Sequence, residues 1–86
     1  MQFDNICAIA TPYGTAGISV IRISGPTVIA EFSKVFKGRN LTKVKTHTVH
    51  YGYILDENGI VLDEIMATIF KAPRSFTAED TVEVST

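Results

Sequence analysis

At 86 residues, with 45% apolar and 20% charged residues, the chain has room for one small globular domain but for no large enclosed site. The formal net charge of −1 gives no overall attraction to nucleic acid or to a membrane, and no apolar run approaches the ~20 residues of a membrane span. The single Cys7 excludes an intrachain disulfide, and the N-terminus lacks the basic start of a secretion signal, so we expect a cytoplasmic protein with no membrane partner.

The first third of the chain predicts two strands and a helix. The apolar run within residues 4–10 predicts the first strand, and the β-branched residues in the range 18–23 predict the second. Arg22 interrupts that second run with a charge. A helix is expected from about Pro26 to Phe36, because its apolar side chains recur at helical spacing and form one stripe: Val28, Phe32, Val35 and Phe36.

Positive charge gathers directly after this helix. Five of the eight cations fall in residues 34–45, and no acid lies between Phe32 and Leu55; the five are Lys34, Lys37, Arg39, Lys43 and Lys45. The more common explanation is a solvated helix end, because cations stabilise a helix C-terminus. A phosphate-binding surface is the second interpretation, and both stay open at this point.

The second half predicts three further strands. Residues 47–55 alternate, with one face that we expect to be buried and that carries Val49, Tyr51, Tyr53 and Leu55. Asn58-Gly59 predicts a hairpin turn into a strand over 60–70, with a bulge or bend at Asp63-Glu64. Residues 81–85 predict the last strand. The expected fold is α+β, with a mostly antiparallel five-stranded sheet and one main helix.

Catalytic and metal-binding residues are not evident. His47 and His50 differ in strand parity, so they point to opposite faces, and no third ligand stands at metal spacing. The paired acids Asp63-Glu64 have no nucleophile beside them. We therefore predict no catalytic residue and no metal in this chain.

Two long ordered blocks carry a resemblance to a known family. Residues 3–12 read Phe-Asp-Asn-Ile-Cys-Ala-Ile-Ala-Thr-Pro, and residues 21–26 read Ile-Arg-Ile-Ser-Gly-Pro after Gly17-Ile18. Residues 72–84 read Ala-Pro-Arg-Ser-Phe-Thr-Ala-Glu-Asp-Thr-Val-Glu-Val, preceded by Asp63-Glu64. Together they resemble the start of the MnmE/TrmE family of tRNA-modification GTPases, and the resemblance spans essentially the whole chain.

The resemblance implies that residues 1–86 form an N-terminal domain that binds tetrahydrofolate and dimerises. Its fold would be similar to the folate-binding domain of glycine-cleavage aminomethyltransferase. Family members also have a helical domain and a GTPase domain, whereas this sequence has no Gly-x-x-x-x-Gly-Lys-Ser/Thr phosphate loop. The family's pattern continues with a His-Gly-Gly-like turn, so we expect an excised domain that is not catalytic alone, from a parent that hydrolyses GTP.

The same resemblance implies the ligand and the partners. Arg22 and Glu83 match the family's folate-binding positions, with 5-formyl- or 5,10-methylene-tetrahydrofolate as the cofactor. GTP, Mg and K would belong to the GTPase domain of the parent. The implied partners are a second copy of the chain, the flavoprotein MnmG (GidA) and tRNA, in carboxymethylaminomethyl-type modification of the wobble uridine U34.

Residues alone leave two alternatives open. Arg22 and Glu83 could be an ordinary cross-sheet ion pair, since such pairs are common. The domain could also be a pure protein–protein assembly module without a small-molecule ligand, using unpaired sheet edges and the apolar helix stripe as its interface.

Overall fold

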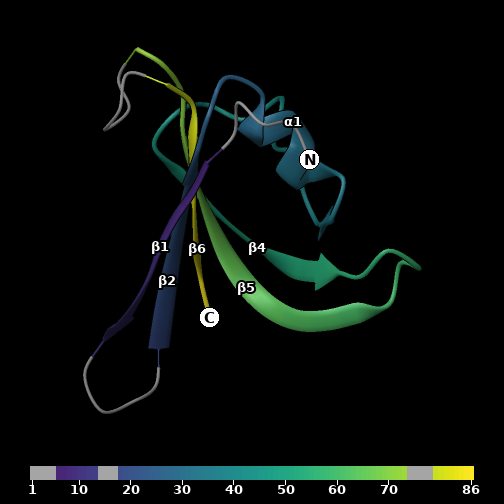
Figure 1. Cartoon of the computed structure of the whole chain (residues 1–86). Coiled ribbons are helices and arrows are strands. Elements are labelled where there is room, and N and C mark those ends of the chain that lie inside the picture. The colour runs from purple at the N-terminus through teal and green to yellow at the C-terminus, as the bar shows by residue number, and fades with distance from the viewer. Residues whose placement is uncertain (1–5, 14–17, 74–78) are drawn as a thin grey trace.

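A computed structural model describes residues 6–13, 18–73 and 79–86, with side chains from Val20 onward. Its sheet has the order β1-β2-β6-β5-β4-β3, and every neighbouring pair is antiparallel. The elements are β1 (Ile6–Tyr13), β2 (Ile18–Ser24), α1 (Val28–Ser33), β3 (Phe36–Lys37), β4 (Thr48–Leu55), β5 (Val61–Phe70) and β6 (Thr81–Ser85). The expected α+β fold with five antiparallel strands and one helix is confirmed (Figure 1). The two-residue β3 adds a sixth strand at one edge of the sheet.

The helix is shorter than predicted. It ends at Ser33, and Phe36 and Lys37 instead pair with Ile54 and Tyr53 of β4. The buried ring of Phe36 still stacks on Phe32, with 5.7 Å between the ring centroids. Val28, Phe32 and Phe36 of the predicted stripe are buried, so they belong to the core, but Val35 is 37% exposed. Tertiary pairing with β4 overrides the helical spacing after Ser33.

The prediction of which face of β4 is buried is wrong. Val49 and Tyr51 are 55% and 56% exposed, whereas Gly52, of the opposite parity, is buried. The register explains the difference, because Gly52 lies opposite the buried Ile65. The alternation itself is correct, but residue size misled the choice of face, since a glycine at the centre of the core face leaves no apolar signal.

The predicted irregularity in β5 is present. Ile54 pairs with Asp63 while Leu55 pairs with Val61, so the register shifts beside the two acids. The turn before it is closed by Asp56, whose Oδ1 accepts hydrogen bonds from the backbone N–H groups of Asn58 and Ile60.

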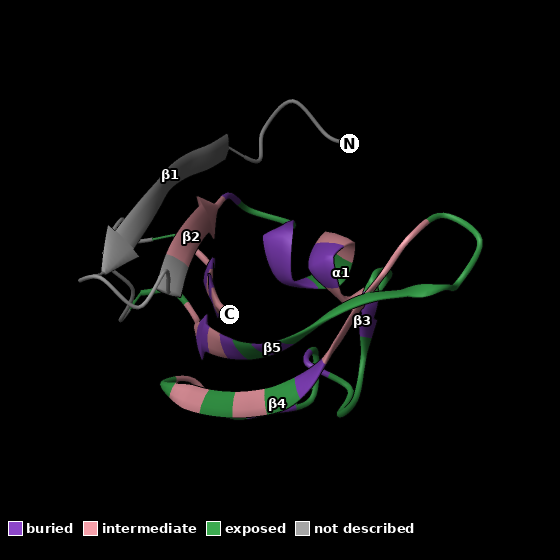
Figure 2. Ribbon diagram, turned by 90° about the horizontal axis from the view of Figure 1, so that it is seen from below, coloured by how far each residue is buried: buried purple, intermediate pink, exposed green. Residues whose placement is uncertain are grey.

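One helix and a loop cover one face of the sheet. Figure 2 shows α1 on the inner side of the curved sheet, with the buried residues gathered between them. Leu41 and Val44, in the loop between β3 and β4, complete this core at 0% and 8% exposure. No helix in the described residues covers the opposite face, which we call the outer face.

Candidate functional site

Arg22 and Glu83 meet on the outer face. They lie directly opposite each other on the antiparallel strands β2 and β6. Arg22 Nε and Nη2 donate hydrogen bonds to the same carboxylate oxygen, Glu83 Oε2, over 3.2 and 2.9 Å. Their neighbours Ile21, Ile23 and Val84 turn the other way and pack on the core, because side chains alternate along a strand.

The Arg22–Glu83 ion pair is neither fully exposed nor fully buried. The side chain of Arg22 is 44% exposed and that of Glu83 is 25% exposed, so the carboxylate lies deeper than its partner. A half-exposed ion pair contributes about 0–1 kcal/mol to the free energy of unfolding. The pair therefore explains little of the domain's stability, and its atoms remain accessible to a ligand.

The carboxylate of Glu83 retains hydrogen-bonding capacity. An ionised carboxylate offers about four acceptor positions, and Arg22 occupies two of them, both on Oε2. Within the described part of the chain, no donor reaches Oε1. Glu83 could thus accept a forked pair of N–H donors from a ligand while Arg22 holds the carboxylate in place.

A row of apolar side chains continues from this pair across the outer face. Cross-strand register places Val49 opposite Thr68 and Tyr51 opposite Met66, and Met66 also pairs with Ser85 of β6. Val49, Tyr51 and Met66 are between 44% and 56% exposed. Thr68 also pairs with Glu83, so Val49 lies in register with the Arg22–Glu83 pair, while Tyr51 and Met66 lie two residues further along their strands. The described fold leaves this apolar row of three side chains uncovered.

Two tyrosines shape the end of this row. The Tyr51 hydroxyl donates a hydrogen bond of 2.6 Å to Glu64 Oε2, and its ring packs edge-on against Tyr53. This hydrogen bond, with a further contribution from Tyr53, raises the pKa of the Tyr51 hydroxyl well above its ordinary value of 10.0. Tyr51, Glu64 and Met66 border a shallow hollow of about 260 Å³ that ends at Ser85 and Thr86.

A larger apolar hollow lies on the opposite, core side. It has a volume of about 390 Å³, and its lining includes Ile21, Phe32, Ile54 and Val84. Among the described residues that line it, Asp63 and Thr86 have polar side chains and the others are apolar. This lining offers few polar groups to fix the orientation of a polar ligand.

The described residues contain no group of three His, Cys, Asp or Glu side chains that could hold a metal ion. They also contain no helix with the length and hydropathy that a membrane crossing requires. The sequence-predicted pair Arg22 and Glu83 is the one that the structure brings together, whereas sequence reasoning missed the Tyr51–Glu64 contact. Tyr51 and Glu64 lie on two strands joined by a hairpin, so their separation in the sequence could have indicated this contact if the strand register had been known.

Comparison with known proteins decides the family. Residues 5–86 match the family described as "GTP-binding protein TrmE N-terminus". The chain belongs to this family. It is 63% identical over all 86 residues to the tRNA modification GTPase MnmE of Acholeplasma laidlawii. It is 53% identical over 85 residues to the protein of the same name from Aster yellows witches'-broom phytoplasma, and 48% identical to that of Streptococcus mutans.

The match covers only part of these MnmE proteins. This chain spans 19% of the length of the Acholeplasma relative and 18% of the other two, while nearly all of its own residues align. The resemblance stated from the two sequence blocks is therefore confirmed, and the chain corresponds to the N-terminal domain of MnmE.

Proposed function

We propose that this domain binds a tetrahydrofolate derivative through Arg22 and Glu83, and that it dimerises. In its parent it would deliver a one-carbon unit for modification of the tRNA wobble uridine in the cytoplasm. The helical and GTPase domains of that parent would supply GTP hydrolysis with Mg and K, and the flavoprotein MnmG would be the second enzyme.

The geometry of Glu83 carries the folate proposal. A pterin ring presents an amino group and a ring N–H side by side, and a carboxylate accepts such a forked pair well. The acceptor capacity that Arg22 leaves on Glu83 matches those two donors. Arg22, being 44% exposed, is also placed to contact the anionic end of a ligand or to orient Glu83.

Dimerisation is supported by the uncovered outer face. Val49, Tyr51 and Met66 expose apolar surface beside the proposed ligand, and β1 and β3 are edge strands. A two-fold axis would pair this surface with itself. We expect the interface to use the sheet edges and the segment from Thr11 to Gly17, of which residues 14–17 lie outside the described residues.

The alternative is an assembly module that binds protein and no small molecule. The same exposed apolar row favours it, because that row alone would serve a subunit interface. In that case the Arg22–Glu83 pair would be an ordinary cross-strand ion pair.

Calorimetric titration of the chain with 5-formyltetrahydrofolate separates the two proposals. p-Aminobenzoylglutamate, the folate tail without the pterin, is the matched control ligand. We expect the folate to bind and the tail alone to bind much more weakly, because Glu83 recognises the pterin. Self-association of the chain without any folate binding at millimolar concentration would favour the assembly module.

A further inference from the structure

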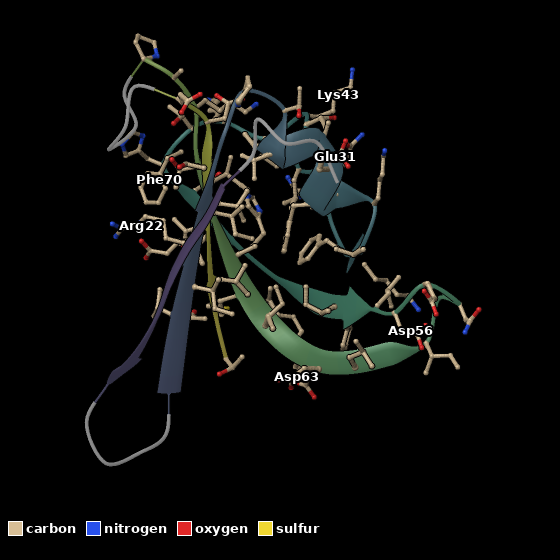
Figure 3. The ribbon with its side chains drawn as sticks, in the orientation of Figure 1. Arg22, Glu31, Lys43, Asp56, Asp63 and Phe70 are labelled. Atoms are coloured by element: carbon tan, nitrogen blue, oxygen red, sulfur yellow. The ribbon has the colours of Figure 1, made fainter. Side chains whose placement is uncertain are left out.

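We propose that the basic segment, residues 34–45, binds the phosphate backbone of RNA. The inference rests on the proposed function in tRNA modification, but it concerns a different surface from the folate site. Figure 3 shows Lys43 beside α1 and Arg22 well away from it, so one ligand need not displace the other.

The charges of this segment face solvent without compensation. All five cations are exposed, and Lys34 alone among them contacts an acid, Glu31, over 3.6 Å. Among the described residues, no salt bridge involves the remaining four. Five of the protein's eight cations thus lie in twelve residues free of acids, while the chain as a whole is slightly acidic. Such a local excess attracts a polyanion even when the net charge does not.

Buried and hydrogen-bonded residues hold the segment in one shape. Leu41 and Val44 anchor it in the core at 0% and 8% exposure. Asn40 Oδ1 accepts hydrogen bonds from the backbone N–H and the hydroxyl of Thr42, over 3.1 and 2.6 Å. The Lys71 ammonium donates to the backbone carbonyls of Thr42 and Val44. Binding would therefore order the cationic side chains but not the backbone, which lowers its entropic cost.

The pattern fits a phosphate backbone better than a membrane surface. Membrane-surface segments combine cations with exposed apolar side chains that enter the lipid. Here Phe36, Leu41 and Val44 point into the core, and only Val35, at 37% exposure, shows apolar surface. The segment is also not an amphipathic helix, because α1 ends at Ser33. Cations without apolar wedges are typical of contacts with phosphate groups, which fix position without reading sequence.

The test is the salt dependence of tRNA binding, followed by fluorescence anisotropy of a labelled, unmodified tRNA. The neutralised variant carries Arg39→Gln, Lys43→Gln and Lys45→Gln. Its matched control carries Arg39→Lys, Lys43→Arg and Lys45→Arg, which keep every charge. Each phosphate contact contributes about 0.7–0.9 to the slope of log affinity against log salt concentration. We expect the neutralised variant to lose about 2–3 from that slope and the control to keep it.

Several outcomes would overturn the proposal. The wild-type chain would show no tRNA binding at low salt, or the neutralised variant would keep both its thermal unfolding transition and an unchanged slope. A neutralised variant that loses binding to vesicles of anionic lipid but still binds tRNA would also overturn it. The folate titration runs in parallel on the same variants and should not change. Absence of folate binding with intact, charge-dependent tRNA binding would contradict the folate proposal and support this one.

Discussion

Arg22 lies in an apolar run, yet strand alternation takes its side chain out of the core. Ile21 and Ile23 pack inward, and Arg22 meets Glu83 on the outer face. The residues alone predicted that Arg22 needs a partner, because an unpaired desolvated charge costs several kcal/mol. They also suggested Glu83 as that partner, and the contact is confirmed.

Tyr51 gives a prediction at the residue scale. Because its hydroxyl donates to the Glu64 carboxylate, deprotonation would break that bond and place two negative charges together. Its pKa in the folded chain is therefore raised above 10.0, and the stability that the hydrogen bond contributes is present below pH 10 and lost as pH rises through the folded pKa. Ultraviolet titration should show one tyrosine that ionises late, and Glu64→Gln should lower its pKa. Three tyrosines that titrate together near their ordinary pKa would contradict this contact.

At the scale of elements, the sequence predicted strands better than it predicted their burial. Periodicity located β2, β4, β5 and β6, because alternation and turn residues are local properties. It missed β3, because a two-residue strand has no period and forms only by pairing with β4. Periodicity also indicated the wrong buried face of β4, because Gly52 lies on the true core face and has no side chain. The space that it leaves is filled by the Phe36 ring.

Gly52 tests this account of the sheet edge. A Cβ at Gly52 would lie 2.5 Å from the backbone carbonyl oxygen of Lys37 and would clash with the Phe36 ring. Gly52→Ala should therefore push β3 away from β4 and lower the free energy of unfolding by about 3 kcal/mol, as overpacking does. Val49→Ala, at an exposed position of the same strand, is the control and should cost about 1 kcal/mol or less. Chemical denaturation measures both, and equal losses would mean that Gly52 does not hold this edge.

At the scale of the whole molecule, one layer of helix and loop covers one layer of sheet. The outer face remains open, and it carries both the Arg22–Glu83 pair and the exposed row Val49, Tyr51 and Met66. Family resemblance predicted a dimer, but no pattern within one strand could have indicated this face, since its residues come from the four strands β2, β4, β5 and β6.

Self-association should depend on that face. We expect light scattering to show a dimer, and Met66→Asp to shift it toward monomer, because a charge would be buried between two copies. Ile60→Asp is the control, since Ile60 is 60% exposed but lies in the β4–β5 turn. A monomer at concentrations well above micromolar would contradict the proposed dimer, and equal effects of both variants would place the interface elsewhere.

GTP hydrolysis should be undetectable in this chain. Although its family is described as a GTP-binding protein N-terminus, the sequence contains no Gly-x-x-x-x-Gly-Lys-Ser/Thr loop to hold the phosphates. The full-length MnmE of Acholeplasma laidlawii, of which the chain covers 19%, is the positive control. Magnesium-dependent phosphate release from the pure chain would refute this expectation.

The most direct test of the folate site is calorimetry on Arg22→Ala and Glu83→Ala with 5-formyltetrahydrofolate. Each loss should be about 1.5–3 kcal/mol, the scale of a hydrogen bond to a charged group, or roughly 10- to 100-fold in affinity. Glu31→Ala, which removes another ion-paired glutamate, in α1, is the control and should bind folate as the wild type does. Unchanged affinity in both site variants, with the thermal unfolding transition intact, would show that Arg22 and Glu83 are a structural pair and no ligand site.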